Sequence, residues 1–168
     1  WGFDPRAMLR AAWGNLLGRE LQGASTITQQ LSKNLFLSPH RTLARKVAEA
    51  ALALFLELRL DKRRILTLYL NHIYLGQDGP ASVMGVRSAA RHYFSKEVAD
   101  LDLPESAFIA GVIRGPGIYN PFRDPRAARA RRDHVLRRKR AENMISQLEL
   151  DAALDAPLDT SRGTTSED

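Results

Sequence analysis

Cysteine is absent from this sequence, which excludes a disulfide framework and a cysteine metal site. Aromatic residues are sparse, at 7% of the chain, while alanine, leucine and arginine are abundant, and this composition favours helices over strands. No apolar run approaches the roughly 18 residues that a membrane span requires, and no signal peptide is recognisable. These absences leave the cellular compartment open.

The chain has 168 residues, of which 44% are hydrophobic, enough to bury one core. We therefore expect a single domain over residues 1–148 and a polar, disordered tail over residues 149–168. The net charge of +6 and the pI near 10.1 indicate a polyanionic partner: nucleic acid, an anionic membrane or a phosphorylated substrate. Because the chain begins at Trp1 rather than Met, we expect it to be a piece of a longer protein.

The segment 23–36 has an unusual composition for a packing helix. Thr26 and Gln29 have the spacing of a capping box, and Ile27 and Leu31 then form an apolar stripe. The remaining positions form a dense run of hydrogen-bonding groups: Ser25, Thr28, Gln29, Gln30, Lys33 and Asn34. Spacing alone favours a capped, solvated amphipathic helix, whereas the choice of residue types favours a binding site.

This segment closely resembles the second signature of the peptidoglycan glycosyltransferases, the domain of class A penicillin-binding proteins and their monofunctional relatives. That signature reads Gly-Gly-Ser-Thr-Ile-Thr-Gln-Gln-x-x-Lys-Asn, and only Ala24 departs from it. Further signatures of the family follow in order: the tail of the first at Gly2-Phe3-Asp4, the third around Arg45-Lys46-x-x-Glu49, the fourth from Ile65 to Phe94, and the fifth from Leu101 to Pro121. Ser95 stands where the family usually has glycine.

The resemblance implies a mainly α fold, with a lysozyme-like helical lobe and a smaller membrane-facing lobe. The residue pattern independently predicts successive helices and no alternating strand. In the helix expected over residues 41–60, the positions at core spacing are Leu43, Val47, Ala50, Ala51, Leu54 and Leu58. The segment 76–82, rich in glycine, proline and aspartate, is expected to be a mobile loop.

A strongly basic helix is expected from Asp124 to about Gln147, packed on the body through Val135, Met144 and Leu148. Its arginines form either a solvated face or a flank that binds anionic lipid headgroups. The aromatic residues of the fourth signature are expected in the core first and as substrate contacts second.

The implied reaction polymerises lipid II into glycan strands with inversion and releases polyprenyl diphosphate. Such a site needs a carboxylate base for the acceptor hydroxyl, and cations, or a divalent Mg or Mn ion, for the leaving diphosphate. Carried over residue by residue, the resemblance implies a clamp of Lys33, Arg41 and Lys46 with the neutral donors Ser25 and Gln30. Further candidates for substrate contacts are Thr28, Gln29, Asn34, Arg45 and Asn71.

Glu49 matches the second catalytic glutamate of the family, and the cations around it are expected to keep it ionised. The alternative interpretation of Glu49 is an ordinary i,i+4 salt bridge with Arg45. The principal carboxylate of the family, in the opening Glu-Asp of the first signature, would lie upstream of Trp1, so we expect this chain by itself to be inactive.

The implied partners are lipid II, the nascent glycan strand, the membrane surface and other cell-wall synthesis proteins, with no nucleic acid. The implied location is the outer, periplasmic face of a bacterial inner membrane, with the anchor in a segment that this chain lacks. Two alternative functions also fit the sequence. A basic helical nucleic-acid-binding module fits the charge, and a lysozyme-like glycan hydrolase fits the implied fold.

Overall fold

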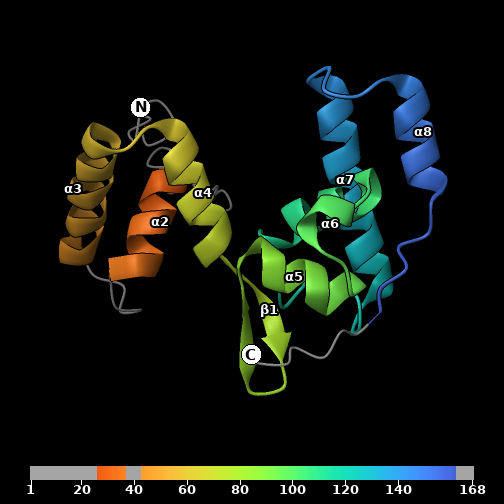
Figure 1. The fold of residues 1–168 in the computed structure, drawn as a ribbon, viewed down its shortest axis with the longest axis horizontal. Helices are drawn as coiled ribbons and strands as arrows, with labels where there is room; N and C mark the ends of the chain where they lie inside the picture. Colours follow the sequence, from red (N-terminus) through yellow and green to blue (C-terminus); the bar gives the residue numbers. More distant parts are fainter. Residues whose placement is uncertain (1–25, 37–42, 162–168) are drawn as a thin grey trace, which may run out of the picture. The chain divides into compact units, whose positions relative to one another are not determined.

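The structure is a computed structural model that describes residues 26–36 and 43–161. The chain divides into two compact units, residues 1–72 and residues 73–168 (Figure 1). The described residues are mostly helical, as expected, with one small sheet. The single domain predicted from composition is thus organised as two units.

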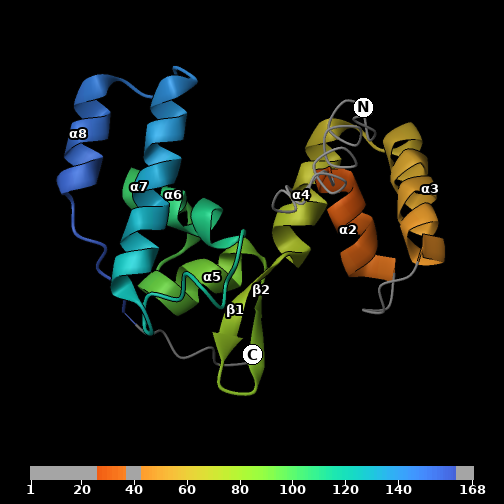
Figure 2. The same cartoon turned by 180° about the vertical axis from the view of Figure 1, so that it is seen from behind.

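The first unit contains α2 (Ile27–Phe36), α3 (Leu43–Arg59) and α4 (Lys62–His72), with α2 packed against both of the others (Figures 1 and 2). The predicted capping box at the start of α2 is confirmed, because the Gln29 amide donates to Thr26 Oγ1 and the Thr26 amide donates to Gln29 Oε1, both at 3.2 Å. Asp61 caps α4 by accepting from the Arg64 amide at 2.7 Å. These caps define where the two helices begin.

The prediction of a core stripe on α3 is wrong for most of its positions. Val47, Leu54 and Leu58 are 70%, 56% and 75% exposed, and Ala51 and Phe55 are exposed beside them. The buried side of α3 instead carries Glu49 and Ala53. Helical spacing identified one apolar face correctly, but spacing cannot tell which face of a helix meets its neighbours. Here the apolar face points away from α2.

The second unit starts with an antiparallel hairpin of β1 (Tyr74–Asp78) and β2 (Ala81–Met84), in which Asp78 pairs with Ala81 and a bulge separates Tyr74 from Gly76. The predictions of no strand and of a mobile loop over residues 76–82 are therefore wrong. A bulged hairpin with only nine strand residues has too little regular alternation to be recognised from sequence.

The hairpin is attached to α5 (Gly85–Phe94) by a close contact at Gly76. A Cβ atom added at Gly76 would lie 2.4 Å from Tyr93 Oη, and the Tyr93 hydroxyl donates to the Leu75 carbonyl at 2.8 Å. Burial, with the nearby Tyr74, raises the pKa of Tyr93 to about 12, so its hydroxyl stays protonated as a donor. Tyr93 and Phe94 are buried among Phe108 and other rings, which confirms their core role.

A short 3-10 turn, η1 (Val98–Asp100), leads into α6 (Leu103–Val112), α7 (Pro125–Ala141) and α8 (Gln147–Asp155). The helix predicted over 124–147 ends earlier than expected, at Ala141. Met144 and Leu148 are 70% and 81% exposed, so their predicted packing is wrong, whereas Val135 does pack on the shared core of α6, α7 and α8. That core consists of Ala107, Leu136, Ile145, Leu150 and Ala153.

The expected disordered tail also differs from the structure, because α8 occupies its first part. A capping box between Ser146 and Glu149 starts α8, and the fully buried Arg132 of α7 holds its end. The Arg132 guanidinium donates to the Leu154 and Ala156 carbonyls at 3.2 and 2.7 Å. A cation at a helix C-terminus stabilises it, so one arginine of the basic helix is structural.

Candidate active site

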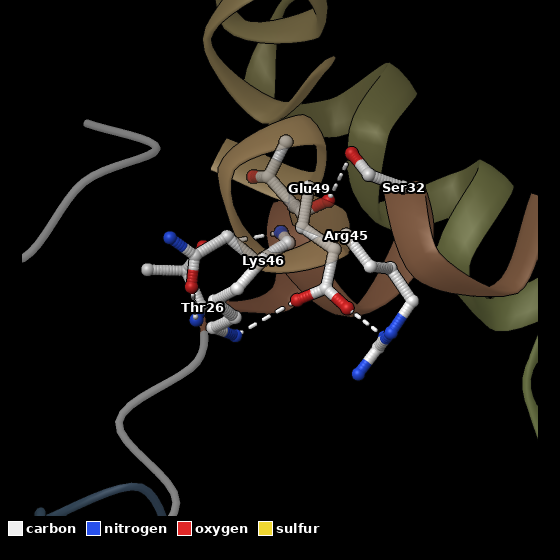
Figure 3. Close-up of polar contacts among 7 residues, drawn as sticks. Thr26, Ser32, Arg45, Lys46 and Glu49 are labelled. Atoms are coloured by element: carbon white, nitrogen blue, oxygen red, sulfur yellow. Dashed lines mark hydrogen bonds and ion pairs between the residues drawn. The ribbon is translucent and has the colours of Figure 1, made fainter. Parts of the chain in front are cut away.

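The candidate site is built around Glu49, whose side chain is only 3% exposed on the α2-facing side of α3. Each of its two carboxylate oxygens forms an ion pair with one cationic side chain. Arg45, one helical turn earlier, pairs with Oε1, and Lys46 Nζ pairs with Oε2 at 2.8 Å (Figure 3). Because the three residues lie at i, i+1 and i+4 of one helix, α3 alone creates the constellation.

The two cations differ in how much of them remains accessible. The Lys46 side chain is 48% exposed and that of Arg45 is 16% exposed. Lys46 can therefore face a ligand while it is still fixed by Glu49, whereas Arg45 is largely occupied by the carboxylate. No acidic residue lies in the first turn of α3, so the positive end of the helix dipole and both cations add up at this helix start. The resulting positive potential suits an anionic ligand.

The interface of α2 with its neighbours is unusually polar, and several predicted contact residues are engaged there. Thr28 and Gln29 are 4% and 3% exposed; the Thr28 hydroxyl donates to Glu57 Oε1 at 2.5 Å, and Gln29 forms the cap. Gln30 Oε1 accepts from the Tyr69 hydroxyl at 3.1 Å, and burial raises the pKa of Tyr69. These side chains fix α2 in place.

The other residues predicted to contact the substrate are either exposed or lie outside the described residues. Lys33 and Asn34 are exposed on α2, and Asn71 is exposed on α4. Ser25 and Arg41 lie outside the described residues. The structure thus brings Arg45, Lys46 and Glu49 together, and presents Lys33 on the neighbouring helix.

Sequence analysis missed Glu57, which lies two helical turns after Glu49 on α3. Its side chain is 12% exposed, and its Oε2 pairs with Lys62 Nζ at 2.5 Å. Burial alone would raise the pKa of Glu57, but hydrogen bonds from Lys62 and Thr28 outweigh burial and hold the pKa below its ordinary value of 4.5. The spacing of eight residues from Glu49 was the available signal, since it keeps both carboxylates near one side of the helix.

A divalent cation is not supported by the part of the chain that the structure describes. No group of three His, Cys, Asp or Glu side chains gathers there to hold a metal ion. Glu49 already has a cation on each oxygen, which leaves it poorly suited as a metal ligand.

Comparison with known proteins identifies the family. A family model described as Transglycosylase matches residues 1–140. The chain belongs to the transglycosylase family. This match confirms the resemblance drawn from the ordered signatures.

Relatives of this transglycosylase chain are penicillin-binding proteins. It is 46% identical to penicillin-binding protein 1B of Haemophilus influenzae over 86% of its length, and 45% identical to penicillin-binding protein 1B of Escherichia coli over 89%. It is 47% identical to penicillin-binding protein 1A of Aquifex aeolicus over 94% of its length. The chain spans 19%, 18% and 21% of these three proteins, respectively.

A crystal structure of penicillin-binding protein 1A from Haemophilus influenzae resembles the transglycosylase chain with a TM-score of 0.55 at 30% identity. The match covers 83% of this chain and 17% of that protein. It supports the mainly α fold class. In the described part of the transglycosylase chain, no helix has the length and apolar character needed to cross a bilayer.

Proposed function

We propose that this chain is the glycosyltransferase part of a cell-wall synthase that polymerises lipid II into glycan strands. In that reaction a sugar hydroxyl of one lipid-linked unit attacks the anomeric carbon of another. The bond from that carbon to the diphosphate breaks with inversion, the hydroxyl proton passes to a base, and polyprenyl diphosphate leaves. The observation that carries the proposal is the Arg45–Lys46–Glu49 constellation, packed beside a helix with the family signature.

The leaving diphosphate is the part of the reaction that the described residues serve best. Lys33 on α2 is exposed and the side chain of Lys46 on α3 is 48% exposed, so two adjacent helices each contribute an accessible lysine. Arg41 and Ser25 occupy the corresponding signature positions and complete the proposed clamp. Two ammonium groups and a helix N-terminus neutralise charge as it develops on the leaving oxygen, and this is the largest electrostatic requirement of the reaction.

Glu49 is proposed to orient this clamp rather than to donate a proton. Its carboxylate fixes the side chains of Arg45 and Lys46, which reduces the conformational entropy that Lys46 would lose when it binds a phosphate. The general base is proposed to come from a carboxylate upstream of Trp1, so the chain alone would bind donor but would not turn over.

The exposed apolar face of α3 is proposed to rest in the outer surface of a bacterial inner membrane. A polyprenyl tail leaves the bilayer only at a cost of about 0.8 kcal/mol per exposed CH₂, so the site must come to the lipid. Val47, Leu54 and Leu58 supply apolar area, and the exposed cations Lys62, Arg63 and Arg64 lie at the start of the next helix, where they suit anionic headgroups. Lipid II, the growing glycan strand and other cell-wall synthesis proteins are the proposed partners.

The test is binding of undecaprenyl diphosphate to the 168-residue chain in detergent, measured by calorimetry. Lys33→Ala and Lys46→Ala should each weaken binding about tenfold, the size expected for one charge-assisted contact. The matched control is Arg87→Ala, which removes an exposed cation on α5 and should leave affinity unchanged. Equal affinity in all four proteins would contradict the clamp and favour a hydrolase, which needs no diphosphate site.

A further inference from the structure

The feature that the proposed chemistry does not use is the partly buried carboxylate of Glu57, whose side chain is 12% exposed. It joins three helices of the first unit: it lies on α3, accepts from Thr28 on α2, and pairs with Lys62 at the start of α4. Both contacts measure 2.5 Å, one to each carboxylate oxygen. We call the group Thr28–Glu57–Lys62 the latch.

The latch matters because its Thr28–Glu57 bond ties α2 to α3, whereas the Tyr69–Gln30 bond ties α2 to α4. Helix α2 has ten residues, too few to be stable by itself. Among the described side chains, the buried apolar residue of α2 is Leu31 and that of α3 is the small Ala53. Apolar contacts tolerate sliding, whereas a hydrogen bond between side chains of two adjacent helices requires one register.

That register determines the geometry of the proposed clamp. Lys33 lies five residues after Thr28 on α2, and Lys46 and Glu49 lie on α3, as Glu57 does. A slide or rotation of α2 against α3 therefore changes the separation of the two ammonium groups that must hold one diphosphate. A displacement of about 1 Å is enough to lose most of the benefit of a preorganised site.

We propose that Glu57 is a positioning residue of the transferase: through Thr28 it holds α2 in the register that sets Lys33 opposite Lys46. This inference rests on the proposed function. Glu57 itself touches neither donor nor acceptor in this scheme. A purely stabilising role would instead leave clamp geometry and donor affinity unchanged once the protein is folded.

The first measurement is the distance between α2 and α3. Because the chain has no cysteine, spin labels can be placed at single engineered cysteines on the exposed positions Asn34 and Ala51. Glu57→Gln keeps the side-chain shape but loses the ion pair with Lys62, and Thr28→Val removes the hydroxyl donor. Each variant should shift or broaden the distance distribution, and the double variant should match Thr28→Val, since the hydroxyl through which Glu57 acts is already absent there. An unchanged distribution in folded Glu57→Gln and Thr28→Val would overturn the proposal.

The second measurement is the affinity of the unlabelled 168-residue chain for undecaprenyl diphosphate. Glu57→Gln should weaken binding about tenfold, whereas the matched control Glu97→Gln, which breaks an ion pair with Arg91 in the second unit, should not. A changed distance with unchanged affinity would make Glu57 structural only and overturn the proposal. If the wild-type chain does not bind the probe, the proposed function fails, while the distance measurement still decides whether the latch sets the register.

If Glu57→Gln fails to fold, Lys62→Met is a milder substitution that removes only the ion pair with Glu57. The Lys62 side chain is 66% exposed, so its loss leaves the Thr28 bond in place and should give a smaller change in the same direction. If Lys62→Met changed the distance between α2 and α3 more than Thr28→Val does, Glu57 would not act on α2 through Thr28, and the proposal would be contradicted.

Discussion

Two glutamates of α3 illustrate how identical side chains acquire different roles from their neighbours. Glu49 is flanked by Arg45 and Lys46 of its own helix, whereas Glu57 bonds to side chains of the two adjacent helices. The first arrangement collects positive charge at a helix start, which suits a ligand. The second ties elements together. Residue type alone does not separate these roles.

The lowered pKa of Glu57 predicts a pH dependence of stability. A folded-state pKa below the unfolded value of 4.5 means that ionised Glu57 stabilises the fold at neutral pH, and that this contribution is lost as pH falls below 4.5 toward the folded value. Wild type should therefore be more stable than Glu57→Gln at pH 7, with the difference shrinking toward pH 3. Chemical denaturation at several pH values measures this, and a constant difference across the range would contradict it.

Ser95 ends α5 in a left-handed conformation, with φ of 53° and ψ of 34°. Only glycine adopts this region without strain, which gives a physical reason for the glycine usual in the family at this position. Ser95→Gly should stabilise the chain by up to roughly 1 kcal/mol, even though it removes a contact with Ser161. Thermal unfolding measures the change, with Ser106→Gly within α6 as a control that should destabilise.

At the scale of elements, α3 has its polar side inside and its apolar side outside. The inner side faces a polar partner, because Thr28, Gln29 and Ser32 of α2 are all buried. An exposed apolar face on a helix marks an interaction surface more often than an isolated exposed leucine does. This reversal is the strongest indication that α3 serves a lipid environment as well as the site.

Replacing the outer leucines of α3 tests that role. Leu54→Ser with Leu58→Ser should weaken co-sedimentation with vesicles of phosphatidylglycerol and phosphatidylethanolamine by about tenfold per leucine, because each buries apolar area in lipid. Stability in solution should change little, since both side chains are already exposed. The control is Met144→Ser with Leu148→Ser, a similarly exposed pair with the same spacing in the second unit. Equal loss in both double variants would remove α3 as the lipid-facing element.

At the scale of the whole molecule, the proposed diphosphate clamp still requires a general base for the acceptor hydroxyl. In the described residues of the first unit, the carboxylates of Glu49 and Glu57 already hold cations. We therefore expect no lipid II polymerisation by the 168 residues alone. The same chain extended by an upstream Glu-Asp segment should polymerise lipid II in a gel assay of glycan strands. Substituting that upstream glutamate by glutamine should abolish the gain, by about 10²-fold or more. Normal polymerisation by the chain alone would refute the assignment of the base.

The family, the caps at the starts of α2 and α4, and the grouping of charges around Glu49 could all be predicted from local sequence. The capping pairs Thr26–Gln29 and Asp61–Arg64 act within one turn, so a few adjacent residues are enough to predict them. The same is true of Arg45, Lys46 and Glu49, which meet because of helical spacing alone.

Contacts between distant segments, which local spacing cannot predict, depend on the tertiary structure. Which side of α3 is buried depends on the surface that α2 offers, and the hairpin at Gly76 depends on Tyr93, seventeen residues later. The burial of Arg132 depends on the carbonyl groups at the end of α8, and the role of Glu57 depends on Thr28, twenty-nine residues earlier. Contacts between distant segments have no period along the chain, so residue type and spacing determined the helices and the family, whereas packing decided which face of α3 is buried and which partners Arg132 and Glu57 have.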